Sequence, residues 1–213
     1  MPASYVFKRM IKDEMKKLSK PIKLRVFMDN NGESQKYAYT MSILKAYEEN
    51  SNGLLTIEEY TLKNNAELAQ KYKVDRSPTI LFIDDEENEL IRYLSAPQGS
   101  EIQPFIQALL IFGGAPNYYE STIKENLENL SPSTIKIMVT NSCAYCPQMV
   151  SIVSQFALAS EGKIKVVIID IMENPDLGEA YDTSSVPLTI INNEKIITGM
   201  VGANEIFDYL FCK

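Results

Sequence analysis

Histidine is absent from this 213-residue chain, and cysteine occurs only three times. Without histidine the chain can form neither a Cys-His nor a Ser-His nucleophile pair, and it has no imidazole ligand for a metal. Cys143, Cys146 and Cys212 are also one ligand short of a four-cysteine zinc or iron–sulfur site within one chain. We therefore expect no bound metal or other cofactor, which leaves redox chemistry at sulfur.

A surplus of basic residues is missing as well. The formal net charge is −7 and the sequence pI is about 4.8, so no excess positive charge is present to neutralise phosphates. Apolar runs stay shorter than the ~18 residues of a membrane span. The start of the chain has the pattern of an amphipathic helix and lacks the apolar segment of a signal peptide. The sequence thus predicts no nucleic-acid or membrane partner, and a cytoplasmic location.

What the chain does contain is one unit repeated twice. Residues 65–78 read N-A-E-L-A-Q-K-Y-K-V-D-R-S-P, and residues 174–187 read N-P-D-L-G-E-A-Y-D-T-S-S-V-P. The leading segments also correspond, with L-S-K-P-I-K-L at 18–24 and L-S-P-S-T-I-K-I at 130–137. Similarity at both ends of a unit, in the same order, indicates an internal duplication.

Each copy predicts the same order of elements: a helix, a strand, a helix, a strand, a short helix, a hairpin of two strands and a final helix. The first copy is expected to have helices at 4–18, 34–50, from Asn65 and 100–111, and strands at 22–28, 54–60, 79–83 and 89–94. The second copy is expected to have helices at 117–130, 146–160, from Asn174 and 203–211, and strands at 134–139, 163–169, 188–191 and 195–198.

This order predicts an α/β fold of two tandem units, each a mixed central β-sheet flanked by helices. The segment F-G-G-A-P-N at 112–117 is the expected boundary between the units. The predicted domains are residues 1–114, which lack a cysteine pair, and residues 115–213, which contain one. The length of the chain and its 45% hydrophobic content suffice for two domains of about 100 residues each.

The motif C-A-Y-C-P at 143–147 follows the first strand of the second copy and lies where a helix should begin. The positive end of the helix dipole and the free N–H groups there favour a thiolate over a thiol. Cysteines in such motifs have pKa values below the ~8.5 of a free cysteine. The spacing lets Cys146 reach back to Cys143, and Pro147 is tolerated early in a helix. The pattern predicts exchange of disulfides, in which Cys143 attacks and Cys146 resolves.

Simpler interpretations of these residues stay open. The pair could be half of a metal site, an inert buried pair, or one half of an iron–sulfur cluster bridging two chains. Cys212 ends an apolar helix face and is expected to be a small buried hydrophobic residue. Tyr145 could pack over the disulfide or be an exposed side chain.

Two prolines complete the pattern. R-S-P-T at 76–79 and S-V-P-L at 185–188 each place a proline between a short helix and the next strand. Pro187 could be an ordinary turn proline, but its position relative to the cysteine motif favours a cis peptide bond, which would leave backbone groups free to pair with a substrate. Pro78 is expected to be cis as part of the fold, with a peptide-binding role for its unit as an alternative.

Together, strand–C-A-Y-C-P–helix and the later S-V-P resemble the thioredoxin/glutaredoxin superfamily. The duplicated whole is similar to the tandem, glutaredoxin-like protein disulfide oxidoreductases of archaea and bacteria. It also resembles the N-terminal domain of the alkyl hydroperoxide reductase flavoprotein subunit, in which only the second of two thioredoxin folds keeps its cysteines. The resemblance covers nearly the whole chain and implies two thioredoxin-like folds.

The resemblance also implies roles for individual residues. Cys143 would be the nucleophile and Cys146 the resolving cysteine. Pro187 would be cis, and the backbone of Val186 would pair with the substrate. Tyr145 matches the tyrosine of the glutaredoxin motif C-P-Y-C and is assigned to substrate binding with Val186 and Pro187.

Three features depart from the family pattern. Many tandem relatives carry two C-x-x-C motifs, whereas the first copy here reads N-N-G-E-S-Q-K at 30–36. The buried aspartate of thioredoxins is replaced by Ile137, so proton transfer from Cys146 needs water or another group. The glutaredoxin signature G-G-x-D is altered to G-M-V-G-A-N-E at 199–205, which argues against glutathione use.

The predicted function is that of a protein disulfide oxidoreductase with a single redox-active disulfide, acting in electron transport and cell redox homeostasis. Its expected partners are protein disulfide substrates and an upstream flavoprotein similar to thioredoxin reductase. One alternative is an electron relay between a flavoprotein reductase and a peroxiredoxin. Another is a non-catalytic, chaperone-like module in which the first domain binds peptides and the cysteines are vestigial.

Overall fold

A computed structural model describes residues 5–28 and 35–211 of the chain. Cys212 and most of the N-N-G-E-S-Q-K segment therefore lie outside the described residues. The first half contains α1 (Tyr5–Met15), β1 (Ile22–Phe27), α2 (Gln35–Glu49), β2 (Leu55–Tyr60), α3 (Ala66–Lys71), β3 (Thr79–Ile83), β4 (Glu89–Tyr93), the 3₁₀ turn η1 (Gly99–Glu101) and α4 (Ile102–Phe112). The second half contains α5 (Glu120–Glu125), η2 (Leu127–Asn129), β5 (Ser133–Val139), α6 (Cys146–Ala159), β6 (Ile164–Asp170), α7 (Pro175–Ala180), β7 (Leu188–Ile191), β8 (Lys195–Thr198) and α8 (Ala203–Phe211).

The duplicated element order predicted from the sequence is confirmed, and it has one clear exception at 117–130. The helix expected there begins only at Glu120 and is divided into α5 and η2, and the two residues Asn117 and Tyr118 are bound to α6 instead. The Asn117 side chain donates to the Gln155 carbonyl at 2.7 Å, and the Tyr118 N–H donates to the Gln155 side chain at 3.1 Å. These bonds hold the start of the second half against α6.

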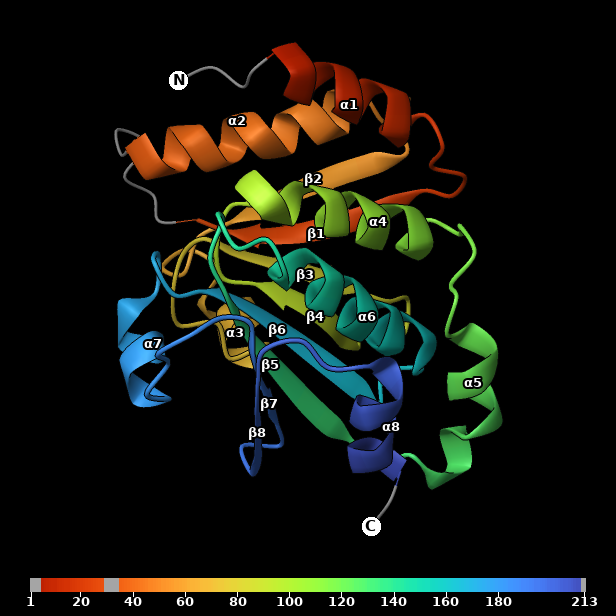
Figure 1. Ribbon diagram of the computed structural model, residues 1–213. Helices are drawn as coiled ribbons and strands as arrows, with labels where there is room; N and C mark the ends of the chain where they lie inside the picture. Colours follow the sequence, from red (N-terminus) through yellow and green to blue (C-terminus); the bar gives the residue numbers. More distant parts are fainter. Residues whose placement is uncertain (1–4, 29–34, 212–213) are drawn as a thin grey trace.

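The strands form a single eight-stranded mixed sheet in the order β2-β1-β3-β4-β6-β5-β7-β8 (Figure 1). Each half contributes four strands in the same internal order, and in each half the first two strands are parallel while the later hairpin is antiparallel. The α/β class with mixed sheets and flanking helices is therefore confirmed. The division at residue 114 stays a prediction, because the sheet runs through both halves without interruption.

The two halves join where β4 pairs with β6. This pairing is parallel, with Ile91, Arg92 and Tyr93 opposite Val166, Val167 and Ile168. At its start the buried Glu89 side chain lies 2.6 Å from the Arg92 guanidinium and 2.7 Å from the Lys165 ammonium, so an ion pair crosses the junction. Because β4 and β6 pair edge to edge, each of them has a strand on both sides, and among the described strands β2 and β8 are the outer ones.

The two faces of the sheet are covered unequally. On one face a large hydrophobic core spans both halves and includes buried side chains from α1, α2, α4, α5, α6 and α8, among them Ile11, Leu44, Phe105, Ile123, Phe156 and Ile206. On the other face two small clusters lie under single short helices, with Tyr72 at the end of α3 in one and Leu177 of α7 in the other. The continuous core explains why α4 of the first half packs directly on α6 of the second.

None of the described helices combines the length and the apolar content that a bilayer crossing requires.

Candidate functional site

The two motif cysteines lie at the junction of β5 and α6. The chain leaves β5 at Val139, turns, and enters α6 at Cys146 with Pro147 in the first helical turn. Cys143 and Cys146 form a disulfide, with their Cα atoms 5.5 Å apart. Cys146 is fully buried, whereas Cys143 is only half-buried. The sulfur that solvent or a partner can reach first is therefore that of Cys143.

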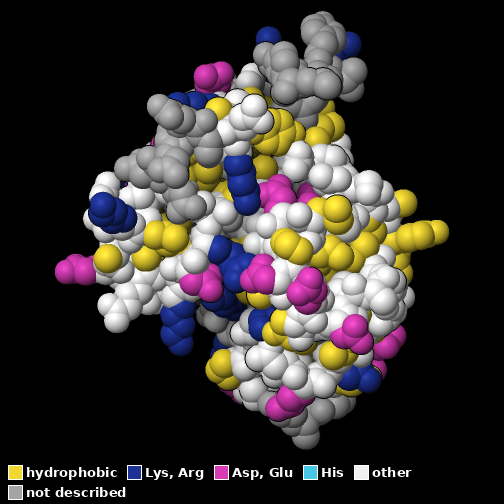
Figure 2. All heavy atoms as spheres, turned by 90° about the vertical axis from the view of Figure 1, so that its left-hand side faces the viewer, with side chains coloured by type: hydrophobic (Ala, Val, Ile, Leu, Met, Phe, Trp, Pro, Cys, Tyr) yellow, Lys and Arg dark blue, Asp and Glu magenta, His cyan; other side chains and the backbone are white. Residues whose placement is uncertain are grey.

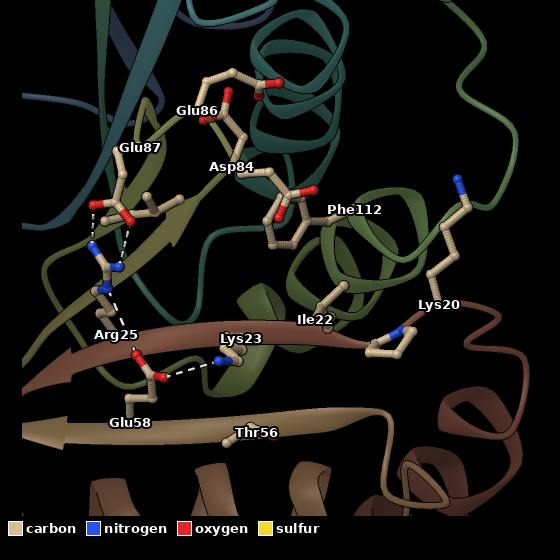
Figure 3. A pocket seen from close by; sticks show the side chains of 13 residues that line it. Lys20, Ile22, Lys23, Arg25, Thr56, Glu58, Asp84, Glu86, Glu87 and Phe112 are labelled. Carbon is tan, nitrogen blue, oxygen red and sulfur yellow. Dashed lines mark hydrogen bonds and ion pairs between the residues drawn. The ribbon is translucent and has the colours of Figure 1, made fainter.

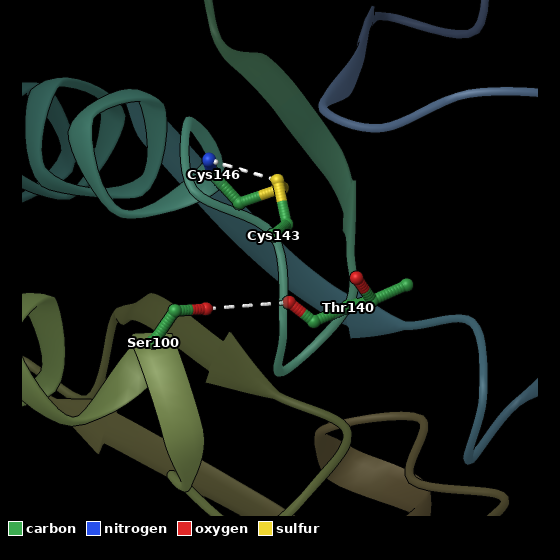
Figure 4. Close-up of a disulfide and its surroundings, with 4 residues drawn as sticks. All are labelled: Ser100, Thr140, Cys143 and Cys146. Carbon is green, nitrogen blue, oxygen red and sulfur yellow. Dashed lines mark hydrogen bonds between the residues drawn. A yellow bond between two sulfur atoms is a disulfide. The ribbon is translucent and has the colours of Figure 1, made fainter.

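The start of α6 is directed at the Cys143 sulfur (Figure 4). The backbone N–H of Cys146 donates to Cys143 Sγ at 3.0 Å, and the N–H of Cys143 donates to the Thr140 carbonyl at 3.1 Å. A thiolate at Cys143 would keep the first of these donors and gain the positive end of the α6 dipole. The local geometry thus favours a negative charge on the outer sulfur.

The Val186–Pro187 peptide bond is cis and lies at the entrance to β7, beside the end of β5. Leu188 pairs with Met138, so the strand register brings the two residues before Leu188 alongside the segment that leads to Cys143. Pro187 is buried and Val186 half-buried, and the Pro187 carbonyl accepts the Gly199 N–H at 2.8 Å. The structure therefore brings Val186 and Pro187 to the same end of the sheet as the disulfide.

Tyr145 is the third predicted substrate-binding residue. Its side chain is 65% exposed at the start of α6, and it makes no capping hydrogen bond with the helix. Of the two placements open from the sequence, the exposed one is therefore observed. The Ser77–Pro78 bond of the first half is also cis, in agreement with the symmetric prediction.

A buried carboxyl group that sequence reasoning missed lies close to this junction. Glu101, the last residue of η1, is 3% exposed, and its carboxylate has no hydrogen-bond partner among the described residues. Burial, together with the nearby charge of Asp170, raises the pKa of Glu101 to about 8. η1 packs against α6, and Asp170 ends β6 opposite Val139. The first half thus supplies a buried acidic group on a turn that packs against α6, the helix that carries Cys146.

No sequence signal distinguishes Glu101 from an ordinary residue of a helix start. An acidic side chain in the first turn of a helix is common, because it faces the positive end of the dipole on the surface. Only the packing of η1 onto the second half buries this one. The second half has Ile137 where thioredoxins have an aspartate, and the buried acidic residue Glu101 comes from the other half of the chain.

Polar contacts also cross between the halves on the surface around the site. Lys36 of α2 lies 3.3 Å from the Glu173 carboxylate, and Arg76 lies 3.1 Å from that of Asp176. The bond from Arg76 lowers the pKa of Asp176. Figure 2 shows basic and acidic side chains side by side near the middle of this face, with hydrophobic side chains to both sides. The two halves are thus held together by charge at the surface as well as by the shared sheet.

A pocket of about 620 Å³ lies at the opposite end of the strands, between the start of β1 and the β3–β4 turn (Figure 3). Four of its charged groups are paired with one another: Glu87 accepts from Arg25 at 2.7 and 2.9 Å, and Glu58 lies 3.6 Å from Arg25 and 3.5 Å from Lys23. The hydrogen bonds that Glu87 accepts, with that of Arg25 first, hold its pKa far below the usual range. The residues that line this pocket include no thiol.

Within the described ranges, no three His, Cys, Asp or Glu side chains are grouped closely enough to hold a metal ion. The first half offers no thiol at the position equivalent to Cys143, because all three cysteines of the chain lie in the second half of the sequence. The functional geometry is therefore that of one dithiol–disulfide pair with a buried carboxyl group nearby.

Comparison with known proteins agrees with this geometry. Residues 133–211 match the family model of the thioredoxin domain. A thioredoxin from Chlorobaculum thiosulfatiphilum is 29% identical over 93 residues, which are 42% of this chain and 86% of that protein. Both matches fall short of half of the chain, and the family model places a thioredoxin-fold domain in its second half.

Two solved structures match nearly the whole chain. A protein disulfide oxidoreductase from Aeropyrum pernix K1 is 26% identical with a TM-score of 0.85, covering 97% of this chain and 91% of that one. The NTD_N/C domain of alkylhydroperoxide reductase AhpF from Enterococcus faecalis is 22% identical with a TM-score of 0.85, covering 98% and 99%. At that identity the second match shows the fold alone. The tandem thioredoxin-like architecture predicted from the sequence is confirmed.

Proposed function

We propose that this chain, whose second half is a thioredoxin-fold domain, exchanges disulfides with protein substrates through the single Cys143–Cys146 centre. The observation that carries the proposal is the asymmetry of the pair at a helix start, with a reachable Cys143 sulfur and a fully buried Cys146. An inert structural disulfide does not need one accessible sulfur aligned with a helix N-terminus.

The reaction begins from the reduced pair. The Cys143 thiolate attacks one sulfur of a substrate disulfide, the substrate S–S bond breaks, and the second substrate sulfur leaves as a thiolate that takes up a proton. Cys143 is now joined to the substrate in a mixed disulfide. Cys146 then loses its proton and attacks Cys143 Sγ, the mixed disulfide breaks, and the second substrate thiol is released. The substrate gains two electrons, and the Cys143–Cys146 disulfide re-forms.

Glu101 is the group that we assign to proton transfer in the second step. A carboxyl group with a pKa of about 8 is mostly protonated at pH 7 and can both accept and return a proton near neutrality. It lies on η1, which packs on α6, the helix that begins with the buried Cys146. Glu101 would therefore accept the proton of Cys146, a transfer for which the sequence predicts a need for water or another group.

The substrate is held, in this proposal, by Val186, Pro187 and Tyr145. Val186 lies at the sheet end next to the disulfide and is half-exposed, so its backbone can pair with an extended segment of substrate. Tyr145 offers an exposed ring directly between the two cysteines in sequence. The reducing environment that such a cycle requires agrees with a cytoplasmic location.

Insulin reduction with dithiothreitol tests the proposal. Cys143→Ser should abolish the activity, and Cys146→Ser should accumulate mixed disulfides with protein partners that mass spectrometry can identify. The double variant Cys143→Ser/Cys146→Ser is the control for non-specific capture. Activity that survives in Cys143→Ser would rule out the catalytic proposal and leave the peptide-binding alternative.

A second candidate is an electron relay between a flavoprotein reductase and a peroxiredoxin. It is favoured by the match of nearly the whole chain to a domain of alkylhydroperoxide reductase AhpF. A coupled assay with NADPH, a thioredoxin-reductase-type flavoprotein and a peroxiredoxin distinguishes the candidates. A relay should turn over peroxide rapidly and insulin slowly, and a general oxidoreductase should show the reverse.

A further inference from the structure

The first half of the chain contacts the redox loop directly, through the backbone and one side chain of η1 (Figure 4). The Ser100 N–H donates to the Asn141 carbonyl at 2.8 Å, and the Ser100 hydroxyl donates to the Thr140 carbonyl at 3.3 Å. Thr140 and Asn141 are the residues that lead from β5 to Cys143. Two hydrogen bonds therefore connect the cysteine-free first half to the segment that leads to Cys143.

Gly99 makes this approach sterically possible. Its φ is +58°, in the region that disfavours side chains, and a Cβ placed there would lie 2.1 Å from the Asn141 carbonyl oxygen. That distance is far inside van der Waals contact with a backbone atom, so any other residue would push the redox loop away from η1. The contact between the halves is thus built around a glycine.

The Thr140 carbonyl is shared between the two halves. It accepts the N–H of Cys143 at 3.1 Å as well as the hydroxyl of Ser100. The hydrogen bond that fixes the backbone of Cys143 therefore ends on the same oxygen that the first half holds from the other side. A displacement of Thr140 would move Cys143 relative to the start of α6.

We infer that Gly99 and Ser100 are positioning residues, through which the cysteine-free half keeps Cys143 within reach of Cys146. The inference rests on the proposed function and gives the first half a specific part in it. When the dithiol is reduced, no covalent bond holds the two sulfurs together, and the ease of ring closure depends on their effective concentration. Holding Thr140 and Asn141 in place raises that concentration and thus favours both resolution and the closed disulfide.

The inference is tested by Gly99→Ala with Gly53→Ala as its matched control. Gly53 also lies in the first half and has φ +78°, but a Cβ there meets nothing within 4 Å. Both variants carry the same kind of backbone strain, and only Gly99→Ala displaces the redox loop. Equilibration with dithiothreitol redox buffers should show the Cys143–Cys146 disulfide about tenfold less stable in Gly99→Ala, a shift of about 30 mV. Gly53→Ala should leave that equilibrium unchanged.

Ser100→Ala and Ser100→Thr supply a second test that does not depend on a strained variant folding. Ser100→Ala removes the hydroxyl and should lower the equilibrium constant two- to threefold and slow the resolution of a mixed disulfide formed with a small aromatic disulfide. Ser100→Thr keeps the hydroxyl and should restore both values. Equal equilibrium constants in Gly99→Ala and Gly53→Ala, or in Ser100→Ala and Ser100→Thr, would overturn the inference.

These measurements use only small thiols and disulfides, so they separate the inference from the proposed function. A shifted equilibrium in a chain that reduces no protein disulfide would leave the positioning role in place and contradict the proposed activity. Normal insulin reduction with unshifted equilibria would do the opposite.

Discussion

The two halves of this molecule repeat the same strands and helices in the same order, yet they have different relations to chemistry. The second half holds the disulfide at the start of α6, with Cys143 half-exposed. The first half has no cysteine, but Ser100 donates hydrogen bonds to the other half's redox loop, and the buried Glu101 lies on the same η1 turn, which packs against α6. The comparison teaches that a copy without reactive groups can still be part of a site, because the sheet places its η1 turn against the other copy's loop.

The contrast also appears in equivalent residues. Asn65 and Asn174 occupy the same position before α3 and α7. The Asn65 side chain accepts the N–H of Thr61 within its own half, at 3.0 Å. The Asn174 side chain donates to the Asp170 carbonyl of its own half, at 3.0 Å, and also to the Leu94 carbonyl of the other half, at 2.7 Å. This position of the repeat thus serves local structure in the first copy, and both local structure and the junction in the second.

The largest effect is expected for a substitution in the hydrophobic core that the two halves share. Phe105 of α4 is fully buried, with its ring centroid 5.1 Å from that of Tyr93 and 5.2 Å from that of Tyr47. Phe105→Ala should lower the free energy of unfolding by about 4 kcal/mol, because it removes a large buried ring and leaves a cavity. Urea unfolding followed by circular dichroism gives this value.

The same variant tests whether the halves are coupled. In the reduced protein, labelling of Cys146 with a thiol reagent reports unfolding of the second half alone. If the two halves share one core, the urea midpoint of Cys146 labelling should fall together with the midpoint of the circular dichroism transition, although the substitution lies in the first half. A labelling midpoint that stays at the wild-type urea concentration would show two independent units.

Glu101→Gln removes the acidic group that the first half adds to the site. If Glu101 transfers the proton of Cys146, the rate of resolution should fall about 10²-fold, and its dependence on pH near 8 should disappear. Stopped-flow measurement across pH 6 to 10 gives both values. Glu67→Gln, at an exposed first-turn position of α3, is the control and should leave the profile unchanged.

Stability should respond to the same substitution with a defined sign. The pKa of Glu101 is raised from 4.5 to about 8 in the folded protein, so the folded state holds a proton that the unfolded state releases above pH 4.5. The wild-type protein therefore loses stability as the pH rises from about 4.5 through 8. Glu101→Gln should flatten this slope and be the more stable form at pH 9, by on the order of 3 kcal/mol. Parallel slopes for the two proteins would contradict the buried, neutral carboxyl group.

Smaller losses of stability are expected for the equivalent asparagines Asn65 and Asn174. Asn174→Ala should cost about 2 kcal/mol, because it leaves the Leu94 carbonyl at the junction without its side-chain donor. Asn65→Ala should cost about 1 kcal/mol, since only one partly buried local bond is lost. Chemical denaturation of both variants measures the difference, and equal losses would show that the junction adds nothing to the local role.

The smallest effect is expected for substrate contact. Tyr145→Ala should raise KM for a protein disulfide about threefold and leave kcat nearly unchanged, because in the proposed binding mode its exposed ring contacts the substrate and takes no part in the chemical steps. Tyr118→Ala is the matched control, as this tyrosine is 84% exposed and precedes α5. An equal response of the two variants would remove Tyr145 from the proposed binding surface.

Much of this architecture could be predicted from the sequence because its signals are local and occur twice. The strands are β-branched and apolar, the short helices begin at Asn65 and Asn174, and the cysteine motif has a fixed spacing. A pattern that recurs in the same order in two copies supports each assignment twice. The positions of Cys143, Cys146 and Pro187 at one end of the sheet follow from this order alone.

What the sequence did not reveal depends on how the copies meet. The pairing of Ile91 with Val166 joins two apolar strands. The sequence of each strand would be the same whether its edge paired with the other strand, with another element or with none. Glu101 looks like an ordinary first-turn acid, and Q-G-S-E gives no indication that Gly99 touches Asn141. Such contacts lie between residues far apart in the chain, and no periodicity records them.

The β4–β6 junction has a consequence for how such a chain can change over time. β6 reads I-K-V-V-I-I-D, a run of β-branched residues that would form an unprotected sheet edge without β4 beside it. An exposed apolar edge of this kind invites strand addition by other copies and aggregation. Loss of the cysteine-free copy would therefore uncover this apolar edge, even with every redox group intact. The first copy covers the edge of its neighbour, whatever else it does.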